Sequence, residues 1–293
     1  MKDYIIRGID SKKSFRIFVV STTNLVEEAR RIHNTSPTST AALGRALTAA
    51  LLMGITMKSS THSLTFKIKG NGPIGNIVTV ANNNGEVKGY VDNPQVDLPS
   101  RLDGKLDVGG IVGKNGQLAV IRDLGLKEPY IGYSNLVSGE IAEDLVHYFY
   151  FSEQQPSAIN LGVLVDKDIS VKAAGGYMLQ ILPNVEEEDI AKIEGILNNA
   201  EPISTLIDKG LSLEEIIEKL FGEFNIEILE KKDVKFKCNC NRERIEGVLI
   251  SLGYEELNSI IEEDGQAEIV CHFCNTKYNF SKKELLEIVN SMI

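Results

Sequence analysis

The four cysteines of this 293-residue chain lie close to its C-terminus, in two tight pairs. Cys238 and Cys240 form a C-x-C pair, and thirty residues later Cys271 and Cys274 form a C-x-x-C pair. Four thiolates in two such pairs can complete a tetrahedral shell around Zn²⁺, with Zn–S distances near ~2.3 Å. The segment that contains them is too short for a hydrophobic core alone to stabilise it. The spacing therefore predicts a C-terminal domain whose fold depends on a metal ion.

The spacing of the cysteines leaves open whether this site is static or a switch. A static structural site is favoured from spacing alone, because four-cysteine zinc sites are common. A switch is also possible, because each pair is close enough in sequence to oxidise internally, and loss of all four ligands would eject the metal. His272 lies inside the C-x-x-C pair, and we expect it not to be a ligand because four sulfurs already complete the shell.

Charge and hydropathy exclude several classes of partner. The net charge is −10, and residues 184–232 carry 13 acidic and 5 basic residues. This acidic balance argues against a nucleic-acid partner, whose phosphates favour a basic surface. No apolar run approaches the eighteen or so residues of a membrane span, and the first residues do not have the pattern of an export signal. We therefore expect no membrane partner and a cytoplasmic location, where thiols are kept reduced.

Residues 1–183 predict an α+β domain with a mostly antiparallel sheet and packed helices. The strand-like runs follow one another through short turns, which favours antiparallel pairing. One of these turns, NNNG, is a strong hairpin signal because Asn and Gly tolerate positive φ. The segment TAALGRALTAALLMGITM is apolar nearly all round and is expected to be a buried helix. The expected strands are DYIIRG, SFRIFVV, SLTFKIKG, GNIVTVAN, EVKGYVD, QLAVIRDLG, SAINLGVLVD and ISVKAAGGYMLQIL.

Residues 184–232 predict an acidic, amphipathic, helical linker between this domain and residues 233–293. Ser212 followed by Glu215 matches a capping box at the start of one of its helices. The apolar stripe of the linker needs a partner surface, which we expect to be the first domain. We predict that this stripe is the responsive part of the molecule. Its residues are Ile190, Ile193, Leu213, Ile216 and Leu220.

Two glycine-rich stretches do not support nucleotide binding. GNGPIG matches the letters of a dinucleotide motif, but another strand-like run follows it where a helix should begin. VGGIVGKN departs from a phosphate loop at its first glycine and at its last residue. His33, His62 and His147 are isolated in the sequence, and no nucleophile is visibly paired with any of them. We therefore expect that the protein is not an enzyme.

The chain resembles the 33 kDa chaperonin family of redox-regulated heat-shock holdases. The resemblance rests on the cysteine pattern at the C-terminal end and covers essentially the whole chain. Segments that fit the family include DYIIRG, PTSTAALGRALTAALLMG, AAGGYMLQILP and DLGLKEPYIGYSNLVSGEIAEDLVHYFYFSEQQPSAINLGVLV.

The resemblance implies a function for each part of the chain. Residues 1–183 would be the chaperone core and dimerisation domain, 184–232 the linker, and 233–293 a redox-switch domain holding one Zn²⁺ through the four cysteines. Reduced protein would be inactive. Oxidation would form the disulfides Cys238–Cys240 and Cys271–Cys274, release zinc and loosen the linker. The homodimer would then hold unfolding client proteins without ATP.

Two other classes of function remain as alternatives. The chain could be an adaptor with a static zinc site, although the acidic charge around the cysteines speaks against nucleic acid as its target. It could also be a thiol oxidoreductase, which would need an exposed thiolate of low pKa in a thioredoxin-like βαβ unit. Neither cysteine pair has that sequence context.

Overall fold

The computed structural model describes residues 2–183 and 185–292. Asn184, the first residue of the predicted linker, and the two terminal residues lie outside the described residues. The chain forms two compact units, Met1–Lys237 and Cys238–Ile293. The division into a core, a linker and a switch domain at 183 and 232 stays a prediction.

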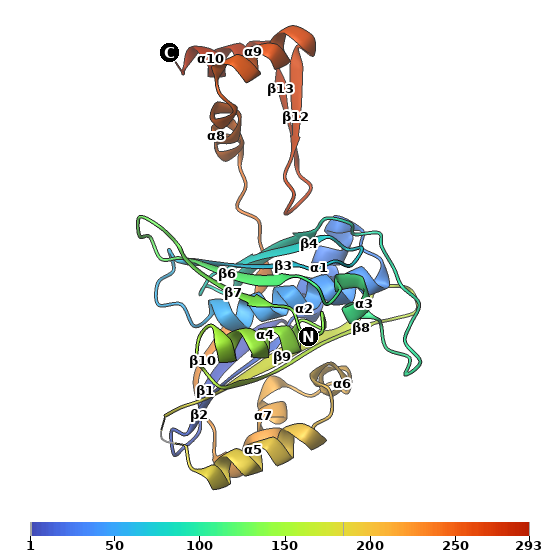
Figure 1. The fold of residues 1–293 in the computed structure, drawn as a ribbon, viewed down its shortest axis with the longest axis vertical. Helices are drawn as coiled ribbons and strands as arrows, with labels where there is room; N and C mark the ends of the chain where they lie inside the picture. Colours follow the sequence, from blue (N-terminus) through green and yellow to red (C-terminus); the bar gives the residue numbers. More distant parts are fainter. Residues whose placement is uncertain (1, 184, 293) are drawn as a thin grey trace. The chain divides into compact units, whose positions relative to one another are not determined.

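The first unit contains two sheets (Figure 1). The five-stranded sheet has the order β10 (Glu227–Asp233), β1 (Tyr4–Ile9), β2 (Phe15–Ser21), β9 (Val171–Ile181) and β8 (Ser157–Val165). The six-stranded sheet has the order β11 (Lys235–Phe236), β5 (Glu86–Val91), β4 (Asn76–Ala81), β3 (Ser63–Lys69), β6 (Gln117–Asp123) and β7 (Tyr130–Asn135). Within these two sheets the strand pairings are antiparallel, except for the parallel pairing of β11 with β5.

Helix α2 (Pro37–Gly54) packs against both sheets and forms the centre of the first core (Figure 1). Sixteen of its residues are buried, as its nearly continuous apolar sequence predicts, because a helix without a polar face must be enclosed. Its N-cap Ser36 accepts a hydrogen bond from the backbone N–H of Ser39, and Pro37 occupies the first turn. Further helices of this unit are α1 (Thr23–His33), α3 (Val108–Val112) and α4 (Ala142–Phe151).

The opposite face of the five-stranded sheet is covered by three acidic helices, which lie below the sheet in Figure 1. They are α5 (Glu187–Asn199), α6 (Ile203–Asp208) and α7 (Leu213–Phe221), followed by the 3₁₀ turn η1 (Gly222–Phe224). Their apolar residues form a second core with Ile6, Phe15, Ile17 and Leu179 of the sheet. The sheet is therefore buried on both faces, which agrees with its long, mostly apolar strands.

The second unit is small and has its own core. It consists of α8 (Arg242–Leu252), α9 (Tyr254–Glu263), the hairpin β12 (Gln266–Val270) and β13 (Lys277–Ser281), and α10 (Lys282–Asn290). The core consists of eight buried residues, namely Ile245, Leu249, Leu257, Ile261, Phe280, Leu285, Ile288 and Val289. So few apolar side chains leave a domain of this size marginally stable without an additional cross-link.

The predicted α+β fold with largely antiparallel sheets is confirmed. The NNNG turn joins β4 to β5, and Gly85 has a φ of +77°. The GNGPIG stretch joins β3 to β4 rather than opening a helix. Ser212 and Glu215 form the predicted capping box of α7. In the first unit, strands β7, β10 and β11 were not among those predicted. In the part of the chain that the structure describes, no helix is both long and apolar enough to cross a membrane.

Candidate metal centre

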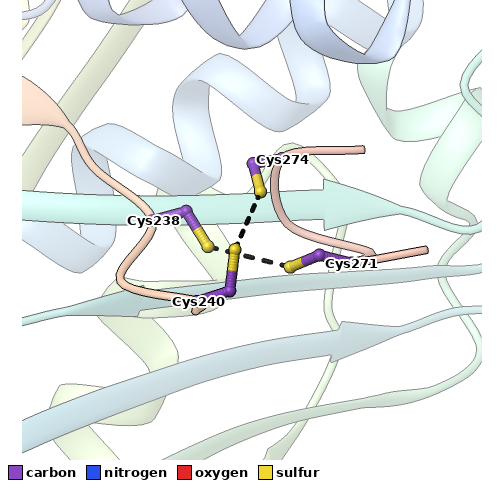
Figure 2. Close-up of side chains that lie close together, drawn as sticks. All are labelled: Cys238, Cys240, Cys271 and Cys274. Atoms are coloured by element: carbon purple, nitrogen blue, oxygen red, sulfur yellow. Dashed lines mark hydrogen bonds between the residues drawn. The ribbon is translucent and has the colours of Figure 1, made fainter. Parts of the chain in front are cut away.

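The two cysteine pairs meet in the second unit. Cys238 and Cys240 lie in the segment that precedes α8, while Cys271 and Cys274 lie on the turn between β12 and β13. The turn is closed by backbone hydrogen bonds from Cys274 N–H and Asn275 N–H to the carbonyl oxygen of Cys271, and Asn275 adopts a φ of +55°. This tight turn orients both of its thiols toward the other pair, as Figure 2 shows.

The distances between the sulfur atoms match a tetrahedral metal site. Cys238 Sγ lies 3.7 Å from Cys271 Sγ, and Cys240 Sγ lies 3.3 Å from Cys274 Sγ. All four sulfurs lie within 4.8 Å of one another. A tetrahedron with Zn–S distances of ~2.3 Å has S···S edges of about 3.8 Å. A disulfide bond would bring two sulfurs to ~2.05 Å, so these are four free thiols arranged as a set of metal ligands.

The four thiols have different electrostatic surroundings. Burial raises the pKa of Cys238 to about 12, and it also raises the pKa of Cys271. Burial acts in the same direction on Cys274, but hydrogen bonds from the hydroxyl and backbone N–H of Thr276, together with those from neighbouring thiols, lower the pKa of Cys274 to about 7. Cys274 therefore ionises near neutral pH, before Cys238 and Cys271, and is the first of these three to offer a thiolate to a cation.

Two hydroxyl groups contact the cluster, and neither was predicted from the sequence. Thr276 Oγ1 lies 3.2 Å from Cys274 Sγ, and the Tyr278 hydroxyl donates a hydrogen bond of 3.2 Å to Cys240 Sγ. The hydrogen bond to Cys240 and burial raise the pKa of Tyr278 to about 12, so the phenol keeps its proton at neutral pH. The sequence signal that could have indicated them is their spacing, because they follow Cys274 by two and four residues.

The structure brings the four predicted cysteines together, and the metal-capable cluster does not include His272, whose side chain is exposed. The residues of the predicted linker stripe lie elsewhere, in the first unit. Ile193, Leu213, Ile216 and Leu220 are buried in the second core, and Ile190 is half-buried.

Polar contacts also hold the three acidic helices to the sheet. The Lys12 ammonium lies 3.0 and 3.1 Å from the two carboxylate oxygens of the buried Asp189 of α5. The Tyr4 hydroxyl donates to Glu214 at 2.7 Å and accepts from the backbone N–H of Leu213 at 3.0 Å, at the start of α7. These contacts join residues more than 170 positions apart, which is why sequence patterns did not indicate them.

A family model described as "Hsp33 protein" matches residues 3–281. The 33 kDa chaperonin of Alkaliphilus oremlandii is 51% identical over 293 residues, covering 100% of this chain and 98% of that protein. The 33 kDa chaperonin of Bacillus cytotoxicus is 49% identical over 292 residues, with full coverage of both chains.

A solved structure has the same fold along nearly the whole chain. The crystal structure of the 33 kDa chaperonin (heat shock protein 33 homolog) from Thermotoga maritima matches with a TM-score of 0.92 at 41% identity, covering 99% of each chain. All three of these relatives are named as chaperonins and not as enzymes.

Proposed function

The chain belongs to the Hsp33 family, and from this membership we propose that it is a redox-regulated, ATP-independent holdase chaperone. It binds unfolding proteins under oxidative stress and prevents their aggregation. The observation that carries the proposal is the convergence of four thiols within 4.8 Å in a unit with a small core. The fold of such a unit responds to the oxidation state of its cysteines, because the same side chains act as ligands and as redox groups.

In the reduced protein, Cys238, Cys240, Cys271 and Cys274 bind one Zn²⁺ as thiolates. Bound zinc would cross-link the segment before α8 to the β12–β13 turn, and such binding supplies on the order of 10–16 kcal/mol in zinc-finger peptides. The donor set supports zinc, since four thiolates in a tetrahedral arrangement are typical of structural zinc sites.

Oxidation by a peroxide removes these ligands. One thiolate attacks a peroxide oxygen and becomes a sulfenic acid, and the released oxygen takes a proton. The second thiol of the pair then attacks the sulfenic sulfur, which forms the disulfide and expels water. Each disulfide yields two electrons, which reduce one hydrogen peroxide to two water molecules. We propose the pairs Cys238–Cys240 and Cys271–Cys274, because once the half-sites separate, each thiol's nearest neighbour is the one in its own pair.

Loss of the metal site unfolds residues 233–293 and loosens residues 184–232. The linker helices α5, α6 and α7 then undock from the five-stranded sheet. This exposes apolar surface on the helices and on the sheet, and that surface binds apolar segments of client proteins. Residues 1–183 keep their own core and act as the chaperone core and dimerisation domain. The activated protein is a homodimer, and the cytoplasm is the compartment in which the reduced state is maintained.

An aggregation assay tests this function. Protein oxidised with peroxide at mildly elevated temperature should suppress light scattering by a heat-denatured client at an equimolar ratio, whereas reduced, zinc-loaded protein should not. ATP should leave both results unchanged. Equal suppression by the reduced, zinc-loaded protein would remove the switch from the proposal.

A variant with all four cysteines replaced by serine provides a control for the chemistry. It has neither ligands nor redox groups, so its activity should be the same before and after peroxide treatment. A response to peroxide in this variant would place the sensor outside the cysteine cluster. Turnover of a small disulfide substrate by the wild-type protein would instead favour a thiol oxidoreductase.

A further inference from the structure

The Tyr278 hydroxyl connects the two halves of the cysteine cluster. Tyr278 lies on β13, which follows the C-x-x-C turn, yet its hydroxyl donates a hydrogen bond to Cys240 of the C-x-C pair. The phenol ring packs against the core of the second unit, and Tyr278 pairs with Ile269 across the hairpin. The ring is therefore held by the hairpin and the core, and its hydroxyl is held at the sulfur.

The hydroxyl contacts are distributed unequally among the sulfurs. Cys240 contacts the Tyr278 hydroxyl, and Cys274 contacts the Thr276 hydroxyl. Thr276 and Cys274 belong to the same turn, so that contact is local. The contact of Tyr278 joins residues 38 positions apart, which makes it the hydroxyl contact that couples the C-x-C pair to the folded hairpin.

We propose that Tyr278 is a positioning residue of the metal centre, whose hydroxyl orients the Cys240 thiolate for metal binding and protects it from oxidation. This inference rests on the proposed zinc site. It assigns to Tyr278 a role in setting the zinc affinity of that site and the reactivity of the site toward peroxide.

Two physical effects of the hydrogen bond carry the inference. Groups that hydrogen-bond to metal ligands orient them, and losing one such group typically lowers metal affinity about 10- to 100-fold. A hydrogen bond to a thiolate also occupies a lone pair and withdraws electron density from the sulfur, which makes the sulfur a weaker nucleophile. Tyr278 should therefore slow the attack of Cys240 on the peroxide oxygen, which is the first step of the two-electron oxidation described above.

The test compares Tyr278→Phe with Tyr254→Phe in the full-length protein. Tyr278→Phe removes the hydroxyl and leaves the ring in the core. Tyr254 is an exposed tyrosine on α9 of the same unit. Its substitution therefore removes a hydroxyl group from a position outside the core. Zinc affinity is measured by competition with a chromogenic chelator. The thiolate-to-metal charge-transfer band is recorded after loading with Co²⁺, and the rate of zinc release is followed after hydrogen peroxide is added.

We expect Tyr278→Phe to bind zinc about 10-fold more weakly, to shift the cobalt charge-transfer band and to release zinc faster in peroxide. Tyr254→Phe should match wild type in all three measurements. A purely structural role of Tyr278 would not shift the charge-transfer band of protein that is fully loaded with metal. If Tyr278→Phe has the zinc affinity and the cobalt spectrum of wild type, the proposed role of Tyr278 is wrong, although the proposed zinc site can still be right. If wild-type protein does not bind zinc, both the role of Tyr278 and the zinc site are wrong.

A second variant keeps the inference testable if Tyr278→Phe does not fold. Replacing Tyr278 with 3-fluorotyrosine retains the ring and makes the hydroxyl a stronger donor. The expected change in reactivity then has the opposite sign, with slower zinc release in peroxide than in wild type. Faster zinc release in this variant would contradict the proposed role of the hydrogen bond.

Discussion

At the scale of single residues, the carboxylates of Asp3 and Asp189 and the thiols of the cysteine cluster contact polar partners, and these contacts influence how the groups respond to solution conditions. The buried carboxylate of Asp3 accepts hydrogen bonds from the backbone N–H of Leu25 at 2.7 Å and from the Asn24 side chain at 3.1 Å. Asp189 is paired with Lys12. At the cysteine cluster, each sulfur lies within reach of the other three. Removing one member of such a set leaves the buried polar groups of the others without a partner, which lowers the free energy of unfolding.

Replacing one cysteine should affect metal binding far more than replacing the neighbouring histidine. Cys240→Ser removes one of four sulfur ligands and should sharply lower zinc affinity, whereas His272→Ala should leave one zinc bound per chain. Zinc content after gel filtration, together with chelator competition, measures both. Loss of the metal in His272→Ala with retention in Cys240→Ser would contradict the ligand assignment.

Asp3 should give the protein a pH-dependent stability. Burial raises the pKa of its carboxyl from 3.8 to about 6, against the effect of its hydrogen bonds. The folded state therefore binds a proton that the unfolded state has lost between these two pH values. The free energy of unfolding should fall as the pH rises through this window, by at most about 3 kcal/mol, since one pKa unit corresponds to ~1.4 kcal/mol.

Urea unfolding of wild type and Asp3→Asn between pH 4 and pH 7 measures this contribution. The stability of Asp3→Asn relative to wild type should increase as the pH rises from 4 to 6 and stay constant above. Asp103→Asn, at an exposed position, is the control and should show no such trend. A difference between wild type and Asp3→Asn that does not change with pH would show that the carboxyl does not titrate in this range.

At the scale of elements, helices α5, α6 and α7 are each attached to the five-stranded sheet by apolar packing and by polar contacts. Lys12 binds α5 through Asp189, Lys172 of β9 binds α6 through Asp208 at 2.9 Å, and Tyr4 binds α7 through Glu214. Helix α5 buries the least, with Ile193 as its one fully buried apolar residue. Burying such a side chain contributes roughly 1.5–3 kcal/mol. Of the three helices, α5 should therefore be released most easily.

A charge placed under α5 should loosen the linker while the metal site remains intact. Ile193→Asp puts a carboxylate into the second core, and Ile216→Asp does the same under α7. Both variants should suppress client aggregation in the reduced, zinc-loaded state. Asn198→Asp adds the same charge on the exposed face of α5 and should remain inactive when reduced. If zinc-loaded Ile193→Asp protein shows fast amide hydrogen exchange in α5 but does not suppress client aggregation, release of this helix is not sufficient for chaperone activity.

The ion pair between Lys12 and Asp189 should control the docking of α5. Lys12→Met leaves the buried Asp189 carboxylate without its cation, so the amides of α5 should exchange faster with deuterated solvent. Lys13→Met, at the neighbouring exposed position, removes the same charge from the same turn and should have no effect on α5. Equal exchange in the two variants would show that apolar packing alone holds the helix.

At the scale of the whole molecule, charge is concentrated in the segment that the proposed function requires to move. Residues 184–232 carry 13 acidic and 5 basic residues, while the chain as a whole carries 41 and 31. Repulsion among these carboxylates opposes docking, and the apolar stripe offsets it. Such a segment is marginally stable beside residues 1–183, which supply most of the residues of the first core.

Hydrogen exchange on oxidised protein locates the moving part. Amides in 185–232 and 233–292 should exchange much faster than in the reduced protein, whereas those of β2 and β9 should stay protected. Mass spectrometry of the same sample should find the disulfides Cys238–Cys240 and Cys271–Cys274. If amides in 185–232 remain as protected as those of β2, the linker is not the responsive element.

Patterns that depend on neighbouring residues were readable from the sequence. The apolar composition of α2 predicts its burial, the NNNG turn predicts the β4–β5 hairpin, and Ser212 with Glu215 predicts the start of α7. The cysteine spacing predicts a set of four ligands because short spacers place two thiols on one turn. Each of these inferences needs only local geometry, which the residue types and their spacing determine directly.

Contacts between distant residues were decided by the tertiary structure. The polar segment EILEKKD becomes strand β10 because it pairs with β1, and YIGYSN becomes β7 because it pairs with β6. The Tyr278 hydroxyl reaches Cys240, and Lys12 reaches Asp189, only after the chain has folded. Local sequence determines which face of an element is apolar. Which faces and edges meet depends on how segments distant in the sequence pack together in each unit, and this packing determines the partners.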